Sequence, residues 1–294
     1  MAARKRLRDE GIPGYDLEAR LMACKAAGKT KEQFTAQAAL YAPDSFSAEL
    51  DDMIRRRLAG EPVAYITGEW EFYGLSLNVS PDVLIPRTDT EILVQEALRR
   101  LRSKEERQRV LDLCCGSGCV GLALAACAPD TRVVLADISR AAVKTARQNS
   151  IKNGLTRSVT VLEADALRRP PTVLGSFDMI VCNPPYIPTV EILTLDPSVR
   201  DYEPRLALDG GPDGLSFYRA IAARWRVMLR QGGSLLFECG EDQASAGAAI
   251  LEQSGFSDIK RCIDTIGVER VVAGIYLGGK ENGGEEKDGS IPGK

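Results

Sequence analysis

The residues best suited to do chemistry form the segment Asn183-Pro184-Pro185-Tyr186. The apolar run 177–182 before it predicts a buried strand, which the prolines must end because proline cannot donate to a sheet ladder. The segment therefore lies at the carboxyl end of a strand, where open α/β sheets bind ligands. Asn183 offers a carboxamide oxygen, Pro184 a backbone carbonyl and Tyr186 a flat aromatic face. These groups suit a planar amino group with two hydrogens, although a plain double-proline loop is the alternative.

A second candidate site is the glycine-rich turn after the predicted strand 110–113. Gly116-Ser117-Gly118 precedes a predicted helix, a geometry that brings a ligand close to the backbone at an electropositive helix N-terminus. Asp137 ends the next predicted strand, 19 positions after Gly118, where a carboxylate suits ribose hydroxyls. The pattern fits either a dinucleotide or S-adenosylmethionine.

Two details favour S-adenosylmethionine over a ligand with phosphates. The G-x-G-x-x-G pattern is incomplete, because Cys114 stands where its leading glycine would be. Asp112 precedes the turn, and a carboxylate there meets an ammonium more favourably than a phosphate. Asp165, which follows the predicted strand 159–162, can accept a hydrogen bond from an adenine amino group. A helix cap or a solvated loop acid is the alternative for Asp165.

Both sites fall within an alternation of strands and helices that starts near residue 109. This pattern predicts an α/β fold with a mostly parallel sheet covered on both faces. The predicted strands are 110–113, 133–136, 159–162, 177–182, 234–237, 259–263 and 270–276, and the predicted helices are 91–101, 120–126, 140–153, 217–229 and 243–253.

The chain before this alternation predicts a separate helical unit. Apolar residues recur at helical spacing between residues 16 and 60. From Tyr65 to Val79 the chain is rich in aromatic and β-branched residues, and Gly74 predicts the turn of a β-hairpin. We therefore expect an N-terminal helical domain at 1–70, a hairpin linker at 71–90 and an α/β domain at 91–278. The glycine- and charge-rich residues 279–294 predict a disordered tail.

Composition excludes several function classes. The 294 residues carry a net charge of −3, so no overall basic field indicates a nucleic-acid partner. The eight cysteines include no C-x-x-C pair, which argues against zinc or another metal and favours free thiols in a reducing cytoplasm. The absence of histidine removes every imidazole mechanism. No apolar run is long enough for a membrane span, and the basic N-terminus lacks the apolar stretch of a signal peptide.

Together these motifs resemble the class I S-adenosylmethionine-dependent methyltransferases. More narrowly, residues 15–278 resemble the bacterial peptide chain release factor glutamine methyltransferases. The narrower resemblance rests on segments outside the methyltransferase core, which are Gly60-Glu61-Pro62, Phe72-Tyr73-Gly74, Ile85-Pro86-Arg87, Tyr202-Glu203-Pro204 and the run from Ala207 to Leu215.

The resemblance implies a Rossmann-like seven-stranded methyltransferase domain at 91–278, a β-hairpin linker and an N-terminal helical domain at 1–70 that recognises the substrate. It implies methyl transfer from S-adenosylmethionine, with S-adenosylhomocysteine as product, to the side-chain amide of the glutamine in the Gly-Gly-Gln loop of class 1 release factors. The positions that it assigns to the cofactor are Asp112, Cys114, Cys115, Gly116, Ser117, Gly118, Asp137, Asp165, Ala166 and Asn183, and those that it assigns to the glutamine are Asn183, Pro184, Pro185 and Tyr186. The family usually has glycine at position 114, a small hydroxyl residue at 115 and a bulky residue at 166.

A mechanism follows from the absent histidine and the two acceptors. The Asn183 oxygen and the Pro184 carbonyl would each accept one hydrogen of the substrate amide. These hydrogen bonds would aim the amide nitrogen at the sulfonium methyl and favour localisation of its lone pair. Tyr186 would pack on the flat carboxamide. Arg87 and Glu203 are expected to form a structural pair rather than to touch substrate. Glu238 is expected to be a loop carboxylate near the mouth of the site.

Three other functions stay open from the sequence. A methyltransferase for a ribosomal-protein glutamine would use the same loop, and so would one for an exocyclic amine of a nucleic-acid base, although the latter usually has a basic groove. A non-catalytic S-adenosylmethionine-binding module is the third.

Overall fold

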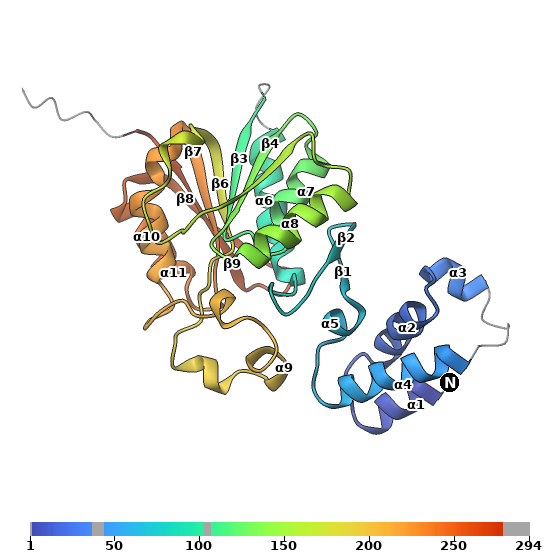
Figure 1. The fold of residues 1–294 in the computed structure, drawn as a ribbon. Coiled ribbons are helices and arrows are strands. Elements are labelled where there is room, and N and C mark those ends of the chain that lie inside the picture. The colour runs from blue at the N-terminus through green and yellow to red at the C-terminus, as the bar shows by residue number, and fades with distance from the viewer. Residues whose placement is uncertain (1, 37–43, 103–106, 279–294) are drawn as a thin grey trace, which may run out of the picture.

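A seven-stranded sheet forms the centre of the chain, with the strand order β5-β4-β3-β6-β7-β9-β8 (Figure 1). The computed structural model describes residues 2–36, 44–102 and 107–278. The strands are β3 (Arg109–Leu113), β4 (Arg132–Asp137), β5 (Val159–Glu163), β6 (Phe177–Cys182), β7 (Leu229–Glu238), β8 (Phe256–Ile263) and β9 (Glu269–Tyr276). The pairs among β3, β4, β5, β6 and β7 are parallel, whereas β9 runs antiparallel to β7 and β8. The predicted α/β fold with a mostly parallel sheet is confirmed.

Helices cover both faces of this sheet, as Figure 1 shows. The helices are α6 (Glu91–Arg102), α7 (Cys119–Cys127), α8 (Arg140–Lys152), α10 (Ser216–Arg224) and α11 (Ala244–Gln253), with the single turn α9 (Pro197–Arg200) in the loop after β6. Side chains alternate along each strand: Val110 packs in the core on the α6 and α7 side, while Leu111 packs with α10 and α11. Both faces are apolar because parallel strands are buried on both sides.

Two predicted boundaries on the α10–β7 side were wrong. The predicted helix 217–229 ends at Arg224 and continues only as a 3-10 turn over residues 226–228. Strand β7 then begins at Leu229, where it pairs with Phe177, well before the predicted start at 234. The two consecutive glycines at 232 and 233 resembled a loop, but Gly232 has φ +77° and the strand continues through it.

The N-terminal region is helical and has its own small core. Its helices are α1 (Ala2–Asp9), α2 (Tyr15–Ala26), α3 (Lys31–Ala36), α4 (Asp44–Leu58) and α5 (Val63–Thr67), and they lie to one side of the sheet (Figure 1). Leu7, Met22 and Ile54 are buried together between α1, α2 and α4. Tyr65, expected in a strand, lies in α5 instead. Pro62 precedes this helix and Gly68 ends it with φ +73°, which are the residues that favour a helix start and stop.

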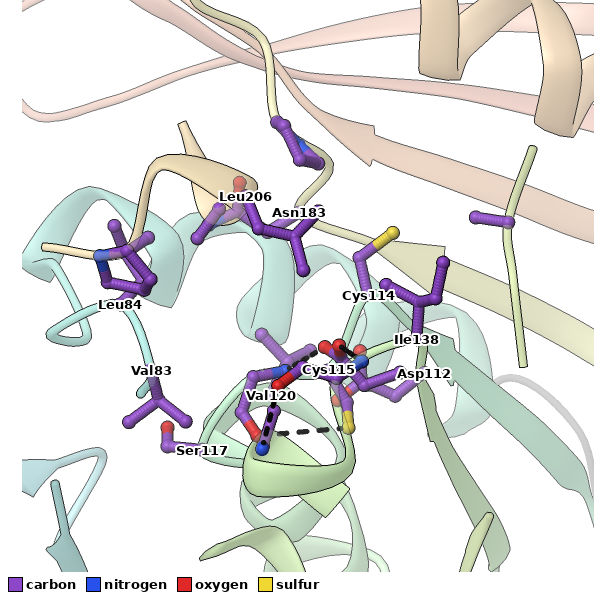
Figure 2. A pocket seen from close by; sticks show the side chains of 18 of the residues that line it. Val83, Leu84, Asp112, Cys114, Cys115, Ser117, Val120, Ile138, Asn183 and Leu206 are labelled. Carbon is purple, nitrogen blue, oxygen red and sulfur yellow. Dashed lines mark hydrogen bonds between the residues drawn. The ribbon is translucent and has the colours of Figure 1, made fainter. Parts of the chain in front are cut away.

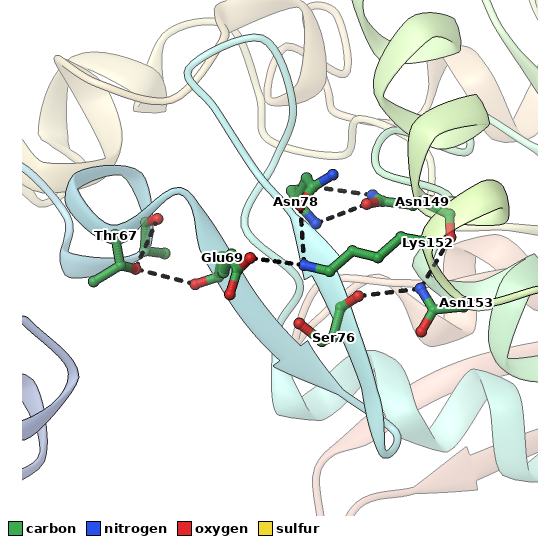
Figure 3. A network of polar contacts seen from close by, with 8 residues as sticks. Thr67, Glu69, Ser76, Asn78, Asn149, Lys152 and Asn153 are labelled. Atoms are coloured by element: carbon green, nitrogen blue, oxygen red, sulfur yellow. Dashed lines mark hydrogen bonds and ion pairs between the residues drawn. The ribbon is translucent and has the colours of Figure 1, made fainter. Parts of the chain in front are cut away.

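The predicted hairpin is present as β1 (Glu69–Phe72) and β2 (Leu75–Asn78). Its two-residue turn has Tyr73 at φ +49° and Gly74 at φ +76°, the positive pair that suits the twist of a tight hairpin. Figure 3 shows the hairpin bound to α8. The buried Asn149 side chain accepts a hydrogen bond from the Asn78 N–H at 2.7 Å and donates to the Asn78 carbonyl at 3.0 Å. The linker is thereby fixed to the sheet domain.

In the ranges 2–36, 44–102 and 107–278 no helix is long and apolar enough to cross a membrane. The tail predicted at 279–294 lies outside the described residues.

Candidate active site

A cavity of about 190 Å³ opens at the carboxyl ends of β3, β4, β5 and β6. It is much larger than the space that one buried water needs, so it has room for a small-molecule ligand. Figure 2 shows Asn183 above the cavity and Asp112, Cys115 and Ser117 below it. The predicted site residues that line it are Asp112, Cys114, Cys115, Gly116, Ser117, Asp137, Asp165, Ala166, Asn183 and Pro185. Gly118, Pro184 and Tyr186 are not among its lining residues.

Asp137 holds the glycine-rich turn in place. Its Oδ2 accepts a hydrogen bond from the Gly116 N–H at 2.8 Å, and its Oδ1 accepts one from the Ser139 N–H at 2.9 Å. Burial raises the pKa of Asp137, while the backbone hydrogen bonds lower it. Each carboxylate oxygen keeps a second lone pair, so Asp137 can still accept from a ligand hydroxyl.

Asp112 is a buried carboxyl with one backbone partner. It is only 1% exposed, and its Oδ2 accepts a hydrogen bond from the Gly121 N–H at 2.8 Å. Desolvation raises the pKa of Asp112 to about 7. A Cβ at Gly121 would lie 2.2 Å from Leu135, which explains the glycine at this position. A cationic ligand group in the cavity would stabilise the ionised form of Asp112.

The turn itself uses unusual backbone conformations. Cys114 has φ +60°, the left-handed region that favours glycine, and this is the position where the resembling family usually has one. Gly118 also has positive φ and begins α7, with Leu135 only 3.0 Å from where its Cβ would be. Gly118 therefore shapes the turn from behind the cavity. Burial raises the pKa of the Cys115 thiol well above its usual range, so it stays neutral.

Asp165 and Ala166 form the wall after β5. The Asp165 Oδ1 accepts a hydrogen bond from the Leu167 N–H at 2.8 Å, so part of its role is the local turn that the alternative interpretation foresaw. Asp165 also lines the cavity. The Ala166 carbonyl accepts a hydrogen bond from Trp225 Nε1 at 3.0 Å, which ties this wall to the core under α10.

The Asn183 amide is held at one end. Its Nδ2 donates to the Thr90 Oγ1 at 3.3 Å. Within the described part of the chain no donor reaches the Asn183 Oδ1 or the Pro184 carbonyl. The Asn183 Oδ1 is therefore an unused acceptor on a residue that lines the cavity, whereas Pro184 is buried and does not line it. Burial raises the pKa of Tyr186, which stays a neutral phenol.

Two glycines of the run 207–215 explain the shape of this loop. A Cβ at Gly210 would lie 2.8 Å from the Pro185 carbonyl oxygen, and one at Gly214 would lie 2.3 Å from the Tyr186 carbonyl oxygen. The Gly210 N–H donates to the Ile187 carbonyl at 2.8 Å. Only glycine allows this close packing of backbone on backbone, and it fixes the loop that carries Asn183.

Two family models match the chain: the Methyltransferase small domain over residues 88–194 and the PrmC N-terminal domain over residues 1–68. A release factor glutamine methyltransferase of Caulobacter vibrioides is 39% identical over 93% of this chain and 94% of its own length. One of Geobacter sulfurreducens is 44% identical over 76% of each chain. The chain belongs to the release factor glutamine methyltransferase family. A methyltransferase structure from Pyrococcus furiosus shares the fold, with a TM-score of 0.50 and 16% identity over 78% of this chain and 99% of that one.

In this family member the expected pair of Arg87 and Glu203 is structural. The Arg87 guanidinium donates to the Glu203 Oε1, and the Ile85 N–H donates to its Oε2 at 3.3 Å. Glu203 is 5% exposed, and burial raises its pKa although Arg87 lowers it. The pair joins the segment after the hairpin to the loop that follows β6. No group of three or more potential metal ligands occurs in the described ranges.

Two residues of this methyltransferase were not placed in the site from the sequence. Thr90 had no assigned role there, but it is buried and its hydroxyl accepts from Asn183. Glu238 was expected in a loop, but it is the last residue of β7 and only 3% exposed. A carboxylate that directly follows the apolar run 235–237 was the signal that could have placed it at the end of a buried strand.

Proposed function

We propose that this chain transfers a methyl group from S-adenosylmethionine to the side-chain amide nitrogen of the glutamine in the Gly-Gly-Gln motif of a class 1 release factor. The observation that carries the proposal is the Asn183 carboxamide. Its Nδ2 is held by Thr90, so its Oδ1 remains available as an acceptor at the cavity wall. Relatives at 39–44% identity are release factor glutamine methyltransferases, which supports the same reaction.

The cavity fits the proposed cofactor in its donor set. Asp137 can accept from ribose hydroxyls, Asp165 can accept from the adenine amine, and the buried Asp112 can balance an ammonium. The turn residues Cys114, Cys115, Gly116 and Ser117 and the small Ala166 would form the remaining wall, while Gly118 would support the turn from behind. When bound, S-adenosylmethionine supplies an electrophilic methyl group on a sulfonium.

The amide nitrogen of glutamine is a weak nucleophile because its lone pair is delocalised into the carbonyl. The Asn183 Oδ1 and the Pro184 carbonyl would each accept one of its hydrogens, and those bonds strengthen as positive charge develops on the nitrogen. Pro185 would keep the loop stiff, and the Tyr186 ring would pack on the flat carboxamide. The chain would thus supply orientation and electrostatic stabilisation with no histidine base.

The proposal names a protein substrate and requires no nucleic acid, metal or membrane. We also place the protein in the reducing cytoplasm. All eight cysteines are free thiols in the structure, which is consistent with that compartment.

The test is methyl transfer from labelled S-adenosylmethionine to a purified class 1 release factor in the absence of RNA. A release factor whose Gly-Gly-Gln glutamine is replaced by alanine serves as the matched control. We expect label on the unmodified factor and none on the control. Label on a ribosomal protein or on RNA, with none on the release factor, would replace this function by one of the two alternative methyltransferases.

A further inference from the structure

The carboxyl end of β7 holds a buried carboxylate that the proposed mechanism does not use. Glu238 is 3% exposed, its Oε2 has no hydrogen-bond partner in the described part of the chain, and it forms no ion pair there. A buried unpaired carboxylate oxygen is costly, so its position needs an explanation.

The sheet register places Glu238 beside Asn183. Strands β6 and β7 are parallel, and Cys182 is the partner of Phe237. The residues that follow this pair are Asn183, directly after β6, and Glu238, the last residue of β7, so both lie at the same edge of the sheet. Thr90, at the start of α6, completes the group: hydrogen bonding from Thr90 and from Asn183 lowers the pKa of Glu238.

The donor and acceptor inventory gives this cluster one consistent arrangement. Asn183 Nδ2 carries two hydrogens, of which one reaches Thr90 Oγ1 at 3.3 Å and the other can reach the Glu238 carboxylate. The Thr90 hydroxyl accepts from Asn183 and has its own hydrogen to donate to Glu238. An ionised carboxylate accepts only, so it would repel the Asn183 Oδ1 if the amide turned over.

We propose that Glu238 is a positioning residue that, with Thr90, fixes the Asn183 carboxamide with Nδ2 against the buried wall and Oδ1 toward the substrate amide. The catalytic consequence rests on the proposed function, whereas the amide orientation does not. Without Glu238 the two orientations of the amide would differ little in energy, and the inverted one would present donors to a substrate nitrogen that also carries donors.

The protonation of Glu238 should then control the arrangement. Burial raises the pKa of Glu238 to about 7, and a protonated carboxyl could donate to the Asn183 Oδ1 and permit the inverted amide. The charged and titratable groups that face Glu238 are Asp89 before α6, Cys119 of α7, Tyr186 after β6, Tyr218 of α10, Cys239 after β7 and Arg270 of β9. Among them Asp89 and Arg270 form an ion pair at 3.1 Å, and the thiols and phenols have raised pKa values and stay neutral near pH 7.

The first experiment measures the amide directly and needs no substrate. The side-chain NH₂ signals of Asn183 are assigned in the ¹⁵N-labelled protein by their loss in Asn183→Ala, and their shifts are followed from pH 5.5 to 8.5. We expect them to titrate near pH 7 in the wild type and to lose most of that titration in Glu238→Gln, where Asp112 of the same cavity is the remaining group with a pKa of about 7. Identical titration curves in both proteins would overturn the proposal, whatever the fate of the release-factor assay.

The second experiment is kinetic. Glu238→Gln keeps the size of the side chain but can hydrogen-bond either orientation of the Asn183 amide. We expect kcat at saturating cofactor to fall at least tenfold, KM for S-adenosylmethionine to change less than twofold, and the decrease in kcat below pH 7 to be weakened. The matched control is Glu163→Gln, an exposed carboxylate at the end of β5 that should leave kcat unchanged.

Two variants of Thr90 test whether a loss of folding, and not the loss of a hydrogen bond, explains a lower kcat. Thr90→Val keeps the shape and removes the hydroxyl, whereas Thr90→Ser keeps the hydroxyl. We expect Thr90→Ser to restore most of the kcat that Thr90→Val loses, at equal thermal stability. A wild-type kcat in Glu238→Gln together with equal kcat in the two Thr90 variants would refute the positioning role.

Discussion

The site has a cofactor half, at the ends of β3, β4 and β5, and an amide half, formed by Asn183 after β6 and by the buried Glu238 behind the cavity wall at the end of β7. The two halves hold their carboxyl groups differently. In the cofactor half, Asp112, Asp137 and Asp165 accept hydrogen bonds from backbone N–H groups at 2.8–2.9 Å. In the amide half, Glu238 is buried, hydrogen bonding from the side chains of Thr90 and Asn183 lowers its pKa against the effect of burial, and its Oε2 has no partner within the described residues.

The difference determines what a substitution can disturb. Backbone donors persist when neighbouring side chains change, so the cofactor half depends mainly on the path of its turn. The amide half combines side chains from β6, β7 and the start of α6, and the loss of any one leaves the others without a partner. Single substitutions should therefore reduce catalysis in the amide half and alter stability or cofactor affinity in the cofactor half.

The largest expected effect is that of Asn183→Ala. The variant removes the acceptor for one substrate hydrogen, and loss of one oriented partner of a developing charge costs about 10²–10³-fold in kcat. Cofactor affinity should change little, because Asn183 contributes only part of the cavity wall. Steady-state kinetics with a release factor and calorimetric titration of S-adenosylmethionine measure the two quantities separately.

A suitable control is Asn153→Ala, at the end of α8 and away from the cavity. It should keep kcat. If Asn183→Ala kept the wild-type kcat at saturating cofactor, Asn183 would have no part in the mechanism. The distinction between the two halves would then be wrong as well.

The next effect concerns Asp112 in the cofactor half. Its pKa is raised from 3.8 to about 7 by burial, so between these values the folded state binds more protons than the unfolded state and stability falls as pH rises. Asp112→Asn keeps an acceptor for the Gly121 N–H and carries no charge. Its stability advantage over the wild type should grow by about 3 kcal/mol between pH 5 and pH 8, at about 1.4 kcal/mol per pH unit up to pH 7.

Urea unfolding of the variant and the wild type at pH 5 and pH 8 measures this difference in stability. The titration of Glu238 cancels, because both proteins contain it. We expect the same variant to bind S-adenosylmethionine more weakly, because it no longer balances the ammonium. Stability curves that stay parallel from pH 5 to pH 8 would show that Asp112 is already ionised in the folded protein at pH 5.

The contrast between backbone partners in one half and side-chain partners in the other also explains how much of each half could be predicted from the sequence. The groups of the cofactor half were predicted from motif spacing, because Asp137 ends a predicted strand 19 positions after Gly118 and Asp165 follows the next predicted strand. In the structure each also bonds a backbone N–H only two residues away, at Ser139 and Leu167. The sheet could be predicted for a similar reason. The spacing of apolar residues that indicates each strand or helix is visible within a short stretch of sequence and does not depend on contacts between distant residues.

The amide half could be predicted only in part. Asn183 was identified from its prolines, but Thr90 lies 93 positions away from it and Glu238 was assigned to a loop. No local pattern joins residues from separate elements, and only the sheet register does so. The wrong start of β7 has a related cause: residues 230–233 fall in a register shift against β6, and the strand continues there through the pairing of Gly233 with Tyr276 of β9.

A smaller effect, on the free energy of unfolding, is expected from Asn149→Ala, because Asn149 holds the glycine-rich turn of the cofactor half. The Asn149 Nδ2 also donates to the Ser117 carbonyl at 2.9 Å, so one buried side chain joins the hairpin to the glycine-rich turn. Its loss leaves backbone groups of Asn78 and Ser117 without partners and should cost about 2 kcal/mol of unfolding free energy. Asn153→Ala, which is half-buried on the same helix, should cost less than about 1 kcal/mol. Equal costs in urea unfolding would mean that water replaces the Asn149 contacts.

The smallest effect tests the turn itself. Cys114 has φ +60°, a conformation that costs a residue with a Cβ roughly 1–2 kcal/mol, whereas glycine adopts it freely but loses more entropy on folding. Cys114→Gly should therefore stabilise the protein by about 1 kcal/mol or less and keep or improve cofactor affinity, because the turn keeps its path. Cys114→Ala separates the two causes: it retains the strained φ and loses only the thiol, so it should show no gain in urea unfolding. A gain of the same size in both variants would assign the effect to the sulfur and its packing against the core, and the backbone of the cofactor half would then be unstrained at this position.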